Sequence, residues 1–143
     1  MRSYETLYHE TLAYLSNRIR YKPCPAKLVH NLAVDLRVDI GFVIDTLGLP
    51  RRIIFRKIEQ SKNLDSGQAE RVIGMQRLIG QVQAMIAESG DREQFDAGRW
   101  LGEWIGQPLP ALGGRRPAEY LGDSAGREWV SQLLRQIQAG VFA

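Results

Sequence analysis

The sequence predicts an all-α protein with an N-terminal helix-turn-helix region followed by a small helical domain. Apolar residues recur at steps of three and four along most of the 143 residues, which is the spacing of one helix face. Proline and glycine separate these stretches, and no segment alternates with the two-residue period of a strand. With 44% apolar and 24% charged residues, the composition is that of a globular domain, and no apolar run reaches the length of a membrane span.

Two helices are expected before residue 39. Ser3 is a suitable cap for the first of them. Its apolar residues fall at helical spacing: Tyr8, Leu12, Leu15 and Ile19. Two prolines, Pro23 and Pro25, end this helix, because proline lacks a backbone donor and disfavours helix in the residue before it. The second helix has an apolar stripe of Leu28, Leu32 and Leu36.

A helix-turn-helix is predicted at about residues 39–61. Asp39 can cap a helix whose apolar side contains Phe42, Val43 and Leu47. In the turn that follows, Gly48 can end this helix and Pro50 can open the next. A basic helix then covers residues 51–61. A helix, a tight turn and a basic helix are typical of a DNA-reading motif.

The outer side of the basic helix is predicted to contact DNA. Ile54 and Ile58 lie four residues apart and are expected to pack inward. Arginine and glutamine can bond to guanine and adenine edges, and lysine suits phosphates. The predicted DNA-binding residues are Arg51, Arg52, Arg56, Lys57 and Gln60. The alternative is a solvated basic face on an ordinary helical hairpin.

Charge is distributed unevenly along the chain and supports the same interpretation. Residues 1–62 contain 11 Lys or Arg and 6 Asp or Glu, which gives +5, whereas residues 63–143 contain 8 and 10, which gives −2. A basic first half and a mildly acidic second half suggest two functions. Nucleic acid is a candidate partner for the first half.

A long amphipathic helix is predicted after the basic helix. Asp65 and Gln68 form the pattern of a capping box. The apolar stripe behind them contains Val72, Met75, Ile79, Val82 and Ile86. The 23 residues from Ser66 to Glu88 span about 35 Å as a helix. A further helix is expected to run to about Ile105, and the last from Ser124 to Ala139, with Gly140 ending it.

The most informative segment lies between these last two helices, at residues 108–121. Its adjacent glycines, Gly113 and Gly114, permit backbone angles that a side chain disfavours. Pro117 stands where a helix can begin. The segment is therefore expected to be a fixed corner between helices rather than a flexible linker.

No catalytic or metal site is expected. The only cysteine, Cys24, excludes an internal disulfide. Cys24 and His30 are six residues apart, but no acidic residue orients His30, and two histidines without a carboxylate cluster make a poor zinc site. We expect no enzymatic activity, no cofactor and no membrane association. Because the N-terminus lacks an apolar signal core, we expect a cytoplasmic protein.

A combined pattern at residues 95–143 resembles a known family. It consists of Trp100-Leu101, the 108–114 segment Pro-Leu-Pro-Ala-Leu-Gly-Gly, then Pro117, Leu121, Gly126, Leu133-Leu134 and a Gly-Val-Phe ending. This pattern resembles the toxin-binding domain of the Xre/MbcA/ParS antitoxins. Two departures are Tyr120, where an aliphatic residue is usual, and Gly122-Asp123-Ser124 before the last helix. The basic helix sits where these antitoxins have an Xre-like helix-turn-helix, although Ile53 and Ile54 replace an early threonine.

The resemblance implies three regions: an N-terminal helical region at 1–63 with the helix-turn-helix, a connecting helix at 64–90 and a toxin-binding domain at 91–143. It implies a type II antitoxin that neutralises a RES-class toxin, which is ADP-ribosyltransferase-like and consumes NAD, by blocking its active site. It also implies autoregulation through operator DNA. The residues expected to bind toxin are Trp104, Leu112, Gly113, Gly114, Tyr120, Gly140, Val141, Phe142 and Ala143.

A homodimer is expected as well, because one chain supplies one recognition helix and helix-turn-helix proteins read two-fold sites as dimers. The apolar stripe of the long helix and the N-terminal helices are expected to form both the core and a dimer contact; the N-terminal residues in this set are Tyr4, Leu7, Tyr8, Leu12 and Leu15. The alternative function is a stand-alone dimeric transcriptional regulator without a toxin.

Overall fold

The computed structural model describes residues 2–90 and 95–140. In these two segments the chain forms helices and no strand, which confirms the all-α prediction; one isolated bridge joins Pro25 and Asn63. The α-helices are α1 (Glu5–His9), α2 (Leu12–Tyr21), α3 (Lys27–Leu36), α4 (Ile40–Thr46), α5 (Arg51–Glu59), α6 (Ser66–Ser89), α7 (Ala97–Ile105) and α8 (Ser124–Gln138). Two 3₁₀ helices, η1 (Pro110–Leu112) and η2 (Pro117–Tyr120), lie between α7 and α8.

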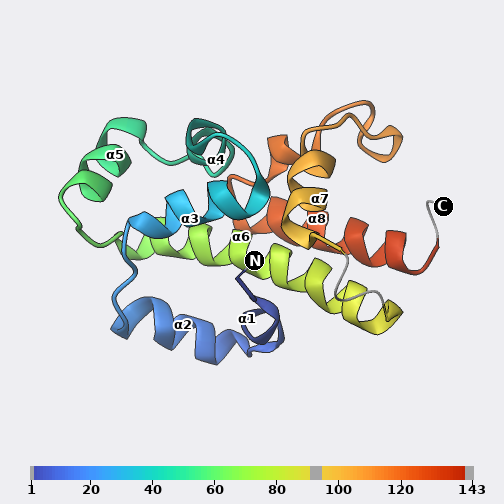
Figure 1. Cartoon of the computed structure of the whole chain (residues 1–143), viewed down its shortest axis with the longest axis horizontal. Coiled ribbons are helices and arrows are strands. Elements are labelled where there is room, and N and C mark those ends of the chain that lie inside the picture. Colours follow the sequence, from blue (N-terminus) through green and yellow to red (C-terminus); the bar gives the residue numbers. More distant parts are fainter. Residues whose placement is uncertain (1, 91–94, 141–143) are drawn as a thin grey trace.

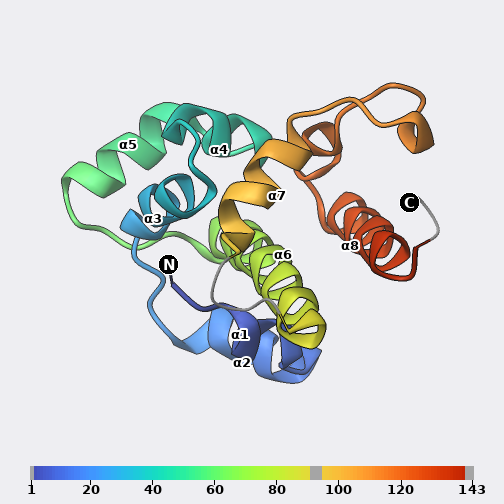
Figure 2. The same ribbon diagram turned by 45° about the vertical axis from the view of Figure 1, so that its right-hand side comes forward.

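Helix α6 is the centre around which the other helices are arranged (Figures 1 and 2). It contacts α1, α2, α3, α7 and α8. Its start has the predicted capping box: Asp65 accepts a bond from the backbone of Gln68, whose side chain bonds back to Asp65. Gly90 ends it at φ +88°. One hydrophobic core cluster includes residues from α3 to α8, so α6 is a core element for both halves of the chain rather than only a connector.

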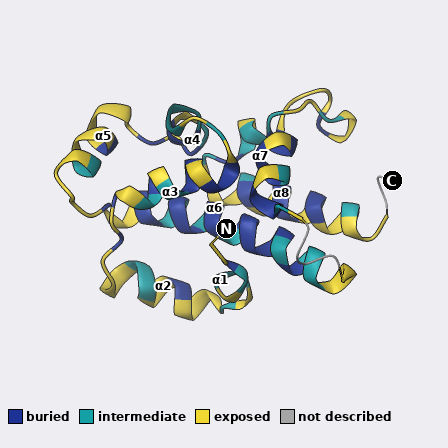
Figure 3. Ribbon diagram, in the orientation of Figure 1, coloured by how far each residue is buried: buried dark blue, intermediate teal, exposed yellow. Residues whose placement is uncertain are grey.

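The burial pattern of α6 corrects the expected dimer contact. Every residue from 68 to 87 is buried or partly buried, and the dark band along α6 in Figure 3 shows this. The apolar stripe is covered by helices of the same chain, so it offers no open face to a second copy. The exposed apolar and aromatic residues of α2 include Leu12 and Tyr21, with 79% and 73% of their surfaces accessible.

The N-terminal region also differs from its prediction, because two helices replace the single one. Glu10 is extended, at φ −72° and ψ 152°, and ends α1. The Thr11 hydroxyl then accepts a bond from the backbone N–H of Tyr14 (3.1 Å) and caps α2. Ser3 caps neither helix, since the N-cap of α1 is Tyr4. The Thr11 cap interrupts the helix in the middle of the apolar stripe, although the apolar residues keep their spacing of three and four across the interruption.

The N-terminal segment is fastened to both α3 and α6. The Tyr4 hydroxyl donates to Asp35 of α3 (2.5 Å), and Arg2 forms an ion pair with the same carboxylate (2.8 Å). The side chain of Gln83 in α6 accepts from the Tyr4 backbone and donates to the Arg2 carbonyl. Burial, and then the bond to Asp35, raise the pKa of Tyr4. The Asp35 carboxylate and the Gln83 side chain are therefore satisfied where the N-terminal segment covers them.

Candidate functional site

The turn between α4 and α5 has the geometry that the sequence predicts for residues 47–50. Asp39 is the N-cap position of α4, and Gly48 adopts φ +65°. The turn is closed by the bond from the Leu49 N–H to the Ile44 carbonyl (2.9 Å). Arg71 of α6 donates to the carbonyl of Gly48 (2.7 Å) and to that of Leu47 (3.1 Å). Arg71 of the core helix therefore holds the turn in place. No pattern in the sequence predicts this role for Arg71.

Helix α5 is attached to the protein by a narrow contact. Ile54 is its one buried residue, with Ile58 partly buried beside it, as the spacing predicts. Ile54 packs in the same core as residues of α4 and the turn: Val43, Ile44, Leu47 and Leu49. The rest of α5 faces outward, which the yellow ribbon at the left of Figure 3 shows.

The five residues predicted to bind DNA fall into two groups. Arg52, Arg56 and Gln60 are exposed together on the outer side of α5. Arg51 instead forms a two-bond ion pair with Asp45 of α4, with both bonds at 2.9 Å. This guanidinium lowers the pKa of the Asp45 carboxyl. The Lys57 ammonium donates to Gln68 at the start of α6 (2.8 Å). Three residues are thus open to a ligand, and two also orient α5.

Two apolar side chains on α5 were not predicted as part of the site. Ile53 and Phe55 expose 45% and 42% of their surfaces. The signal was present in the sequence, since residues directly before and after the inward Ile54 point about 100° away from it on a helix.

The segment from 108 to 121 is the fixed corner that the sequence predicts. The Leu109 carbonyl accepts from the Gly114 N–H (2.9 Å), and the Leu109 N–H donates to the Arg115 carbonyl (3.0 Å), which closes the loop. Gly113 and Gly114 have φ of +64° and +85°, where a side chain would be strained. Pro117 begins η2, and Leu112 and Leu121 anchor the corner in the core.

Arg127 of α8, which sequence reasoning missed, ties the corner to α6. Its side chain is only 6% exposed. It forms an ion pair with Glu70 of α6 and donates to the Leu121 carbonyl (3.0 Å). Farther along α8, Ser131 and Gln81 of α6 bond to each other twice, at 2.8 and 3.0 Å. Helix α8 and the corner are therefore held against α6 by buried polar bonds as well as by the apolar core.

The predicted toxin-binding residues occupy different environments. Trp104 and Leu112 lie in the core, exposing 9% and 5%, so their contribution is to hold the domain together. Trp104 stacks on the more exposed Trp100, with ring centroids 5.7 Å apart. The glycines of the set, Gly113, Gly114 and Gly140, are exposed. The remaining three, Val141, Phe142 and Ala143, lie outside the described residues.

Tyr120 belongs to an aromatic pair on the surface of this domain. It meets Trp129 of α8 edge to face, with centroids 4.8 Å apart. Trp129 is 42% exposed, and sequence reasoning did not select it. Tyrosine and tryptophan are enriched at the centres of protein interfaces. Tyr120 lies in the same segment as the exposed Gly113 and Gly114, and α8 contributes Trp129, so the exposed surface of this domain includes aromatic rings and bare backbone.

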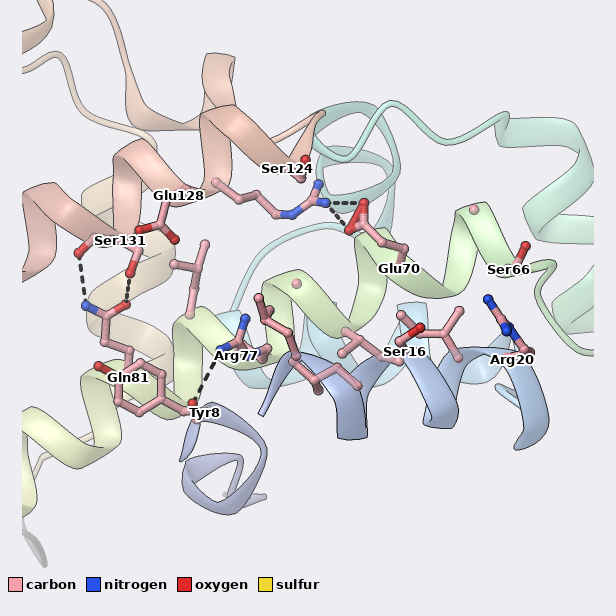
Figure 4. A pocket seen from close by; sticks show the side chains of 18 of the residues that line it. Tyr8, Ser16, Arg20, Ser66, Glu70, Arg77, Gln81, Ser124, Glu128 and Ser131 are labelled. Carbon is pink, nitrogen blue, oxygen red and sulfur yellow. Dashed lines mark hydrogen bonds and ion pairs between the residues drawn. The ribbon is translucent and has the colours of Figure 1, made fainter. Parts of the chain in front are cut away.

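A groove of about 870 Å³ lies on another side of α8, between α2, α6 and α8 (Figure 4). Leu15, Ile73 and Leu78 give it an apolar floor. Its two glutamates already have arginine partners, Glu70 with Arg127 and Glu128 with Arg135. The groove thus lacks a free acidic group that could act as a general base or metal ligand.

The described residues contain no cluster of His, Cys, Asp and Glu suited to a metal ion. Cys24 is buried, and burial raises the pKa of its thiol, which disfavours the reactive thiolate. Across residues 2–90 and 95–140, the helices are too short or too polar to span a membrane.

Comparison of the sequence with known proteins identifies the class of protein to which the chain belongs. Residues 92–140 match the family described as the antitoxin Xre/MbcA/ParS C-terminal toxin-binding domain. This range contains α7, the corner and α8. A protein of Sphingobium sp. (strain YBL2), described as a Prs ADP-ribosylating antitoxin, is 42% identical over 108 residues, covering 76% of this chain and 68% of the relative. The chain belongs to the Xre/MbcA/ParS family of antitoxins.

Proposed function

We propose that this antitoxin neutralises an ADP-ribosylating toxin by direct contact through its C-terminal domain. The observation that carries the proposal is the 42% identity to the ADP-ribosylating antitoxin, over most of both chains. The rigid corner and the Tyr120–Trp129 pair supply an exposed, preorganised surface, which lowers the entropy cost of binding. A RES-class toxin, which consumes NAD, is the partner that we propose.

Neutralisation is proposed to occur by obstruction of the toxin's NAD site. The corner and the end of α8 at Gly140 are the parts of the domain that we assign to this role, together with residues 141–143. Deletion of residues 140–143 is expected to restore NAD loss and growth arrest in cells that express the toxin beside it. Full neutralisation by a folded truncated chain would contradict the assignment of the tail, and failure of the full-length chain to bind the toxin would contradict the function.

We also propose that α4, the turn and α5 bind operator DNA and regulate the antitoxin's own operon. The supporting observation is that Arg52, Arg56 and Gln60 are exposed along a basic helix that bonds to Asp45 and Gln68. The turn before this helix is held by Arg71. A homodimer would present two such helices to a two-fold site. Such a protein acts in the cytoplasm and needs no catalytic activity or cofactor.

The DNA assignment is tested by Arg52→Ala and Arg56→Ala. Each is expected to weaken promoter binding about fivefold or more, since a good base contact contributes about 1–3 kcal/mol. Arg115→Ala, which removes the same charge from the corner, is the matched control and should leave DNA binding unchanged. Mobility-shift titrations at one fixed salt concentration measure all three. Unchanged binding by the double α5 variant would remove this helix from the DNA interface.

The second candidate function is a dimeric transcriptional regulator without a toxin, and the exposed basic side of α5 favours it equally. The two functions differ in one measurement. Expression of the neighbouring reading frame alone should be toxic if the chain is an antitoxin, and harmless if it is only a regulator.

A further inference from the structure

Helix α5 exposes two large apolar side chains among its charges. Phe55 and Ile53 flank the exposed side whose centre is formed by Arg52 and Arg56. Other large apolar side chains, such as Leu12 and Val34, are exposed as well, but Phe55 and Ile53 stand among the positive charges of α5. A ligand that offers both negative charge and an apolar group would pair with the arginines and cover this apolar surface at the same time.

The two side chains are about equally exposed, but their polar neighbours differ. Ile53 lies one turn before Lys57, whose ammonium is bound to the largely buried Gln68. Phe55 lies one turn after Arg51, whose ion pair with Asp45 remains more than half exposed on both sides. Phe55 is also three residues after Arg52, and residues at that spacing are neighbours on one helix face. The phenyl ring therefore stands beside Arg52 on an open flank.

The charge of α5 fits duplex DNA, the ligand proposed above for this helix. Helix α5 carries four basic residues (Arg51, Arg52, Arg56 and Lys57) and one acidic residue, Glu59. A phosphate backbone complements this charge. In the major groove, the apolar group available to a side chain is the 5-methyl of thymine, and phenylalanine is among the residues that contact it. A guanine beside that thymine supplies acceptors for an arginine.

We propose that Phe55 contacts the 5-methyl group of a thymine adjacent to the guanine bonded by Arg52, and so selects an A·T pair in each half-site. The inference rests on the proposed binding of α5 to operator DNA and adds the chemistry of one base position. Phe55 is then a specificity-determining residue, while Arg51 and Lys57 position the helix that carries it.

Replacing thymine by deoxyuridine removes the methyl group and leaves every hydrogen bond of the base pair in place. The experiment uses the full chain and the promoter DNA of its own operon, with each thymine of the footprint replaced in turn. Replacement at one thymine per half-site is expected to weaken binding by the unaltered protein about fourfold, the value of one buried methylene. Phe55→Ala should bind both DNAs equally. The control Ile53→Ala has a similarly exposed side chain on the other flank and should keep the fourfold difference.

Each other outcome overturns the inference in a distinguishable way. If the unaltered protein does not bind the promoter at all, the proposed DNA function fails, and the inference fails with it. If it binds, but either no deoxyuridine replacement matters or Phe55→Ala is as sensitive as the unaltered protein, only the inference fails. If Phe55→Ala instead changes the oligomer mass in light scattering or the affinity for the toxin, while its thymine preference persists, Phe55 belongs to a protein contact. Circular dichroism confirms that each variant is folded.

Discussion

Helices α5 and α8 have comparable amphipathic character, yet they are buried to very different extents. Both follow a tight turn or corner and have basic residues in the last turn. Helix α5 buries Ile54 alone. Helix α8 buries Arg127, Val130, Ser131, Leu133 and Leu134, and shares polar bonds with α6. Helix α5 therefore leaves most of its surface exposed, whereas α8 packs one side against the rest of the chain and has one exposed aromatic side chain, Trp129.

The largest effect should come from the closest backbone approach of α8. A Cβ at Gly126 would overlap the carbonyl oxygen of Tyr120, which is backbone and cannot rotate away. We expect Gly126→Ala to lower the free energy of unfolding by about 3 kcal/mol or more, as overpacking does. Gly106→Ala is the control, because its Cβ would meet atoms at 3.6 Å or more. Urea denaturation measures the stability of both variants. Equal stabilities would show that α8 is not packed as tightly as its buried residues indicate.

The second contrast removes one buried anchor from each helix. Leu134 in α8 and Ile54 in α5 are both fully buried. Leu134→Ala should cost about 3 kcal/mol and reduce toxin binding, whereas Ile54→Ala should cost about 2 kcal/mol, because fewer neighbours surround the site. Ile54→Ala should abolish promoter binding and leave toxin affinity unchanged. A loss of both activities in both variants, measured at a temperature where each is folded, would contradict separate roles.

A third prediction concerns the bonds that fasten the N-terminal segment to α3 and α6. Tyr4→Phe removes a bond to the buried carboxylate of Asp35 and should cost about 1.5 kcal/mol near pH 7. The raised pKa of Tyr4 means that the folded chain keeps the phenolic proton, while the unfolded chain loses it above about pH 10. The stabilisation is thus complete below about pH 10 and is lost above it. The difference between the two proteins in urea denaturation should shrink as pH rises past 10.

Tyr21→Phe is the control for this titration, because Tyr21 is 73% exposed. It should change neither the stability at pH 7 nor its pH dependence. A Tyr4→Phe difference that stayed constant up to pH 11 would contradict the role assigned to the proton.

The smallest effect on stability is expected at the exposed aromatic side chain of α8. Trp129→Ala loses an edge-to-face contact with Tyr120 and should cost less than about 1 kcal/mol. Toxin affinity, measured by calorimetry, should nevertheless fall at least tenfold if this pair is at the centre of the interface. A variant with unaltered affinity would leave the glycine corner and the chain end as the toxin surface.

Local rules in the sequence were sufficient for the elements that depend on neighbouring residues. The capping box at Asp65, the turn at Gly48, the corner at Gly113 and Gly114 and the inward direction of Ile54 all follow from spacing and backbone preference. The same rules failed at Thr11, where a side-chain cap interrupts a continuous apolar stripe. The pattern of residues 95–143 also sufficed to identify the family, because it combines turn geometry with helix packing.

Tertiary structure decided which faces of those helices are free. The sequence alone favoured α6 as a dimer contact and Trp104 as an interface residue, but packing of distant segments covers both. By contrast, the sequence does not predict the ion pair of Arg51 with Asp45 or the bonds from Arg71 to the turn. These contacts form only because α4, α5 and α6 pack next to one another. Periodicity specifies that a helix has an apolar side; only the folded chain specifies what covers that side, because burial is a property of contacts between segments far apart in sequence.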